Sequence, residues 1–113
     1  MQNKSKDLSR TSILREWRAV IRRELAAQYV DYVQATGVVN YRAVPGNLGA
    51  EVAIRDLDEQ RSEIVVLSWW TNLDAIQAFA GRDVTRARYF PDDDQYLLTR
   101  PERVQHYQST GHG

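Results

Sequence analysis

Two side chains in this sequence could carry out proton and anion chemistry together. His106 lies in a segment that alternates like a strand, whereas His112 lies between glycines near the end of the chain. An imidazole with a pKa near about 6.5 exchanges protons at neutral pH, so His106 is our candidate for a general base. Arg15 could stabilise an oxyanion that forms when a bound molecule loses a proton. The alternative for His106 is a strand histidine that is hydrogen-bonded at an interface.

Large aromatic side chains could form a pocket for a flat molecule. An apolar cavity with a few convergent polar groups is the usual form of a small-molecule site, and aromatic rings stack on aromatic ligands. Our candidates for substrate binding are Trp17, Trp70, Phe79 and Tyr89. Packing in the core or at a dimer interface is the competing interpretation of the tryptophans, because large aromatics dominate both environments.

Three consecutive aspartates, Asp92 to Asp94, raise the question of a metal site. A calcium loop would alternate Asp, Asn and Gly before a distant Glu, and that pattern is absent from the sequence. We interpret the aspartates as the N-cap of a following helical turn. The sequence therefore predicts no metal and no resident cofactor.

Composition excludes several classes of function. The chain has 113 residues, and its 15 basic and 15 acidic residues give a formal net charge of zero, so no positive field attracts nucleic acid. No run approaches the ~20 apolar residues of a membrane span. The sequence contains no cysteine, which suits a reducing cytoplasm, and we expect a cytoplasmic protein.

The candidate residues must be positioned by alternating strands and helices. Period-two alternation predicts strands over residues 11–19, 49–57, 64–70 and 103–108. Helical spacing predicts a helix over residues 22–35 with Gly37 as its C′ residue. It predicts a second helix, capped by Thr71 or Asn72 and ended by Gly81, with an inward stripe of Leu73, Ile76, Phe79 and Ala80. A further helical turn over residues 83–89 is also expected.

This order of elements predicts a ferredoxin-like α+β fold with an antiparallel sheet. We expect one domain over residues 11–108, between flexible tails at residues 1–10 and 109–113. The strand over residues 64–70 is apolar on both faces and should lie inside the sheet. Since two helices cover only one face, a second copy of the chain is the simplest cover for the other, and we expect a homodimer.

Several segments resemble antibiotic-biosynthesis-monooxygenase-like proteins of the dimeric α/β-barrel superfamily. They are residues 68–81 (SWWTNLDAIQAFAG), 86–93 (RARYFPDD), 104–107 (VQHY) and 46–50 (GNLGA). The resemblance implies a dimeric barrel with a pocket between the inner face of the sheet and the helices. It also implies a cofactor-independent oxidation of an aromatic, phenolic or quinone-like small molecule. A non-catalytic binding protein or a structural homodimeric module is the alternative.

Haem-degrading members of that superfamily give a separate comparison. The positions of their helical Trp and their iron-ligating His fall on Phe79 and Tyr89, and their first-strand Asn has no counterpart here. A lone tyrosine without the remaining ligands makes haem degradation a weaker prediction.

Overall fold

Four antiparallel strands form the sheet of a computed structural model that describes residues 12–110. They are β1 (Ser12–Arg22), β2 (Asn47–Asp56), β3 (Arg61–Trp70) and β4 (Gln105–Ser109), in the order β2-β3-β1-β4. This arrangement confirms the predicted fold class and the central position of β3. The segment at residues 1–10, interpreted as a tail, and His112 lie outside the described residues.

The first helical region is longer than its sequence pattern predicted. A 3-10 turn (Arg23–Leu25), α1 (Ala26–Val33), a π-helical turn (Gln34–Val38) and α2 (Val39–Ala43) follow one another without a break. The prediction that Gly37 ends this helix was therefore wrong. Gly37 is buried inside the π turn, which inserts one residue and brings Val33 and Val38 to the same inward side.

The second helix, α3 (Leu73–Ala80), begins and ends as predicted. The Asn72 side chain accepts a hydrogen bond from the Ala75 backbone at 2.9 Å, and Gly81 adopts a φ of 93°. Its predicted inward stripe was partly wrong, because Leu73 is 51% exposed in the first turn while Ala75, Ile76 and Phe79 are buried.

Residues 82–104 cross back over the helix side of the sheet with little regular structure. The predicted helical turn at residues 83–89 does not form; an isolated bridge pairs Arg86 with Arg103 instead. The capping interpretation of the aspartates was also wrong. Only a short 3-10 turn (Asp93–Gln95) follows, its N-cap residue Asp92 makes no side-chain cap, and Asp93 is buried.

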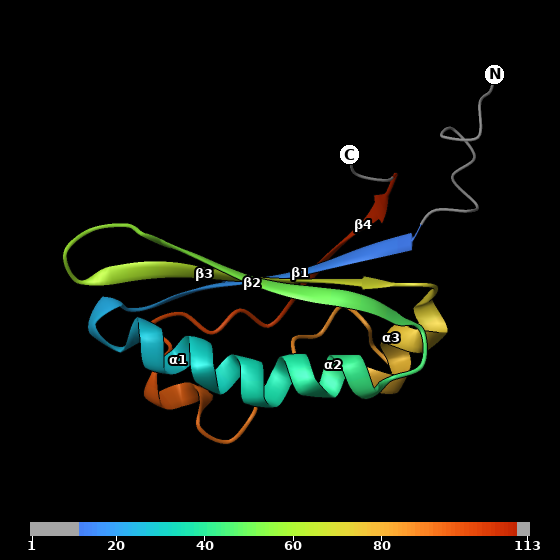
Figure 1. Cartoon of the computed structure of the whole chain (residues 1–113), viewed down its shortest axis with the longest axis horizontal. Helices are drawn as coiled ribbons and strands as arrows, with labels where there is room; N and C mark the ends of the chain where they lie inside the picture. The colour runs from blue at the N-terminus through green and yellow to red at the C-terminus, as the bar shows by residue number, and fades with distance from the viewer. Residues whose placement is uncertain (1–11, 111–113) are drawn as a thin grey trace.

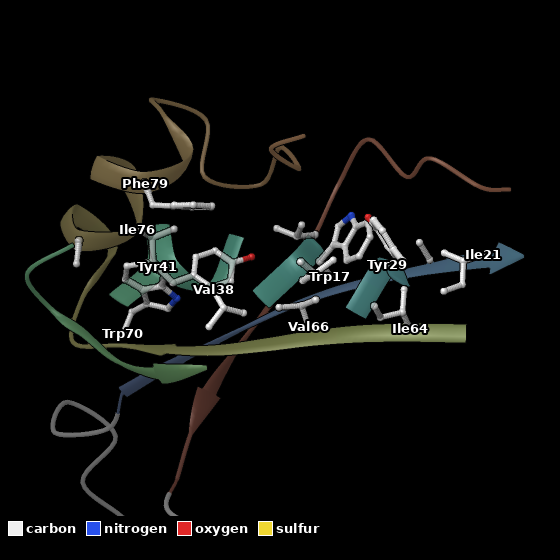
Figure 2. Close-up of a cluster of buried hydrophobic side chains, with 14 residues drawn as sticks. Trp17, Ile21, Tyr29, Val38, Tyr41, Ile64, Val66, Trp70, Ile76 and Phe79 are labelled. Carbon is white, nitrogen blue, oxygen red and sulfur yellow. The ribbon is translucent and has the colours of Figure 1, made fainter. Parts of the chain in front are cut away.

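The helices cover one face of the sheet, and the described part of a single chain leaves the other face open (Figure 1). Alternation along β1 and β3 sends every second side chain into the core, including Trp17, Ile64 and Trp70. Figure 2 shows Trp70, Tyr41 and Phe79 at one end of this core and Trp17 and Tyr29 toward the other.

Candidate functional site

Arg15 is the most unusual side chain of the core. It is 2% exposed, and no salt bridge to it occurs within residues 12–110. Its Nη1 donates to the Val84 carbonyl, and its Nη2 donates to the Arg86 carbonyl at 3.0 Å. Its Nε has no hydrogen-bond partner. Burial lowers the pKa of the guanidinium, yet arginine keeps its charge in proteins, so a buried cation stands here without an anionic partner.

His106 lies beside Arg15 on the neighbouring strand. Register places the two residues opposite each other on β1 and β4, with 3.1 Å between Arg15 Nη1 and His106 Nε2. A guanidinium can only donate, so Nε2 accepts and the ring proton of a neutral imidazole is on Nδ1. Burial, and then the charge of Arg15, lowers the pKa of His106. The two residues that we predicted to carry the chemistry are thus in contact. The basic nitrogen of His106, Nε2, already accepts a hydrogen bond from Arg15.

Trp17 and Tyr89 form a second contact among the candidates. Trp17 Nε1 donates to Tyr89 Oη at 3.3 Å, and the rings meet edge to face with centroids 6.1 Å apart. The Tyr89 hydroxyl donates in turn to the Pro101 carbonyl. Burial raises the pKa of Tyr89, so its phenol stays protonated at neutral pH. Since Phe79 has no ligating atom and the Tyr89 hydroxyl makes two hydrogen bonds, neither offers an iron ligand.

Trp70 and Phe79 are core residues in this structure. Trp70 is fully buried, and its Nε1 donates to Ser68 Oγ at 2.8 Å. Phe79 packs against Tyr41 with a centroid distance of 4.4 Å, and the Arg88 guanidinium lies 4.9 Å from the Phe79 ring centroid. Arg88 also lies 5.0 Å from the ring centroid of Phe90, so it bridges two aromatic side chains.

A small cavity lies between the sheet and the first helical region. Its volume is about 30 Å³, which holds one or two water molecules. The lining includes Arg15 and Trp17 among the predicted residues, but not Trp70, Phe79, Tyr89 or His106. The rest of the lining comes from the helices, the segment 82–104 and β3: Tyr29, Val33, Thr36, Gly37, Tyr41, Val66, Arg88, Phe90, Asp93 and Val104.

Asp93 supplies a negative charge to the same cavity. Its Oδ1 accepts from Tyr29 Oη at 2.9 Å, and its Oδ2 accepts from the Phe90 backbone at 2.6 Å. Burial raises the pKa of Asp93, and burial also raises the pKa of Tyr29. The sequence analysis did not place Asp93 or Tyr29 at this site, although the run of three aspartates was a signal that one of them has a structural or functional role.

The cavity thus has two cationic and one anionic side chain among aromatic rings. If the lining side chains separate, these groups suit a small molecule with a polar or anionic group near Arg15 and a hydrogen-bond donor near Asp93. Within residues 12–110, no group of three or more His, Asp or Glu side chains is arranged to hold a metal ion. No helix of that part of the chain is long and apolar enough to cross a membrane.

Comparison with known proteins identifies a family. The sequence model of a family described as antibiotic biosynthesis monooxygenase matches residues 14–87. No curated protein matches the chain.

Solved structures share the fold at low sequence identity. A Bacillus cereus protein provisionally described as an antibiotic biosynthesis monooxygenase aligns with a TM-score of 0.61 and 11% identity, over 91% of this chain and 97% of the other. A protein of unknown function from Nitrosomonas europaea aligns with a TM-score of 0.62 and 12% identity, over 93% and 95%. A Bacteroides thetaiotaomicron protein with the same provisional description as that of B. cereus gives 0.55 and 15%, over 91% of each chain.

Proposed function

Because the chain belongs to the antibiotic biosynthesis monooxygenase family, we propose that it oxidises a small phenolic or quinone-like aromatic molecule without a resident cofactor. The observation that carries this proposal is the buried Arg15, which has no carboxylate partner and an unpartnered Nε among the residues that the structure describes. A buried charge that is not neutralised destabilises the fold. Its presence at this position therefore favours a role in binding or catalysis. A guanidinium at the wall of a cavity stabilises an anion that forms there.

The aromatic lining supports the same substrate class. Trp17, Tyr41 and Phe90 line the cavity, and their rings favour a flat, apolar molecule. The cavity, at about 30 Å³, is far smaller than the roughly 300–1,000 Å³ of a typical ligand site. Substrate entry therefore requires the lining side chains to separate, and the segment 82–104, which has little regular structure, is the part we expect to move.

The proposed chemistry starts with the loss of a proton from the substrate. Deprotonation gives a phenolate or carbanion, Arg15 stabilises its negative charge, and the electron-rich anion reduces molecular oxygen. When a methylene carbon is oxidised, one oxygen atom forms the new carbonyl and the other leaves as water. The sequence predicts His106 as the general base, but its Nε2 accepts a hydrogen bond from Arg15 here, so in that role His106 would first have to separate from Arg15.

Oxygen uptake tests the proposal. The purified protein is assayed with a panel of phenols, hydroquinones and anthrone-like ketones, together with Arg15→Gln and a control, Arg82→Gln, in which the arginine is exposed. We expect uptake with at least one compound, and a decrease in kcat/KM of about 10²–10³ for Arg15→Gln alone. Equal rates for wild type and Arg15→Gln would contradict the role of Arg15.

A binding protein without catalysis is the second candidate. It is favoured by the occupied Nε2 and lowered pKa of His106, because both weaken a base next to the cavity. Saturable binding of a phenol without oxygen uptake or product would establish this alternative.

We also propose that the protein acts as a homodimer through the open face of the sheet. Val65, Leu67 and Trp69 on β3 lie half-buried on that face, which no helix of the described chain covers (Figure 1). A second sheet packed there would remove this apolar surface from water.

A further inference from the structure

A buried carboxylate and a buried guanidinium line the same cavity without pairing with each other. Asp93 is 5% exposed, Arg15 is 2% exposed, and no salt bridge involves either within residues 12–110. Each ion would be stabilised by a direct contact with the other, yet the fold holds them apart on the cavity wall. A ligand in the cavity could therefore meet both charges. The carboxylate could accept a hydrogen bond or a proton from it, and the guanidinium could stabilise a negative charge on it.

The two carboxylate oxygens of Asp93 are held but not saturated. Each accepts one hydrogen bond, from Tyr29 Oη and from the Phe90 backbone, and an ionised carboxylate has about four acceptor sites. Asp93 can therefore accept a further hydrogen bond from a ligand. His106, by contrast, does not line the cavity, and its basic Nε2 is 3.1 Å from Arg15 Nη1.

We propose that Asp93, rather than His106, accepts the proton of a phenolic or enolic ligand in this cavity, an inference that rests on the function proposed above. The ligand O–H bond breaks, a new O–H bond forms on the Asp93 carboxylate, and the electron pair stays on the ligand oxygen. Arg15 then stabilises the resulting oxyanion. No electron is gained or lost in this step, so it needs no co-reactant.

Several neighbouring groups raise or lower the pKa of Asp93. Arg100 and the hydrogen bonds to Asp93 favour its ionised form, whereas burial and the neighbouring Asp94 favour the protonated form. Burial has the largest influence and raises the pKa of Asp93, which makes the carboxylate a stronger base. The other titratable and charged groups at this part of the fold are Arg15, Tyr29, Tyr32, Tyr41, Arg88 and Tyr89.

The test follows a single proton. The probe is 4-nitrophenol, whose neutral and ionised forms absorb at different wavelengths, bound at saturation to the full chain over a range of pH in which Asp93 is ionised. An internal transfer from ligand to Asp93 leaves the ionised fraction of bound probe nearly independent of bulk pH. In Asp93→Asn, the proton must go to water, and the ratio of ionised to neutral probe should change about tenfold per pH unit. The control variant Asp94→Asn, at an exposed neighbouring position, should keep the pH independence of wild type, because Asp93 is still present to take the proton.

Two further variants keep the result decisive if Asp93→Asn does not fold. Tyr29→Phe removes a hydrogen bond that lowers the pKa of Asp93, so it should increase the ionised fraction of bound probe. His106→Gln should leave the pH independence intact. Three results would overturn the role of Asp93 without affecting the proposed substrate class. They are an ionised fraction that stays independent of pH in Asp93→Asn, an ionised fraction that is unchanged in Tyr29→Phe, and a pH-dependent fraction in His106→Gln. Failure of the wild-type protein to bind the probe would overturn this role and the proposed substrate class together.

Discussion

Arg15 and His106 are ninety-one residues apart in sequence and in hydrogen-bonding contact in the sheet. Period-two alternation predicted the strands that carry Arg15 and His106, but not the sheet face on which each side chain lies. It could not predict the groups that meet them there. Tyr41, Arg88 and Asp93 reach the cavity from a helix that continues past its predicted end and from a segment without periodicity, so no repeating pattern marks them.

At the residue scale, His106 should make stability depend on pH. Its pKa in the folded protein is lowered, first by burial and then by Arg15, so below about pH 6.5 the unfolded chain binds this proton more readily than the folded chain. The free energy of unfolding should therefore decrease as the pH falls through that window. His106→Gln should show a smaller decrease, measured by urea denaturation at about pH 5.5 and 7.5. An equal decrease in both proteins would show that other groups cause it.

At the element scale, the π-helical turn is the feature that the sequence did not predict. Gly37 after an amphipathic stretch is typical of a helix end, yet its φ is not positive and the chain continues to Ala43. Boundaries that depend on local caps were predicted well, as Asn72 and Gly81 demonstrate. A boundary that depends on distant packing was not, because Val38 and Tyr41 are held in the core by tertiary contacts.

The π turn also brings Gly37 to the cavity wall opposite Phe90. A Cβ at this position would lie 4.0 Å from Phe90 Cε2, an ordinary contact, so Gly37→Ala should fold. We expect the free energy of unfolding to rise by about 0.4–1 kcal/mol, since alanine has fewer unfolded conformations to lose. The added methyl group narrows the cavity, so phenol affinity should decrease by roughly severalfold, an effect that follows from lost room for the ligand.

The matched control for this change is Ala35→Gly, at an exposed position of the same turn. It should lower stability by about 0.5–1 kcal/mol and leave phenol affinity unchanged. Denaturation curves and binding titrations on the two variants measure both quantities. Unchanged affinity in Gly37→Ala would argue against binding next to the π turn.

At the scale of the whole molecule, the uncovered face of the sheet is the reason that we expect a homodimer. The run of apolar residues in β3 indicated from sequence that both of its faces need cover, and the fold provides cover on one side only (Figure 1). Sequence alone could not give the geometry of a second subunit, because that depends on how two surfaces fit. Charged side chains also lie on this face, including Arg18, which forms ion pairs with Glu16 and Glu63. Such charges would determine how two subunits align with each other.

Leu67→Lys tests the homodimer. Leu67 is on the open face, and its cross-strand partners are Glu16 and Glu51, so an introduced ammonium is tolerated in a single subunit but not at an apolar interface. We expect a folded monomer by sedimentation and circular dichroism, where the wild-type protein is a dimer. The control Leu73→Lys, at an exposed position on α3, should remain dimeric. A dimer that survives Leu67→Lys would place the interface elsewhere.

The most direct test of the central claim is the quenching of tryptophan fluorescence by a phenol or quinone. Trp17 lines the cavity, whereas Trp69 is on the opposite face of the sheet. If the cavity is the ligand site, wild type and Trp69→Phe should show saturable quenching with the same midpoint, and Trp17→Phe should lose most of the signal. Quenching that persists in Trp17→Phe and disappears in Trp69→Phe would place the ligand on the open face and contradict this account.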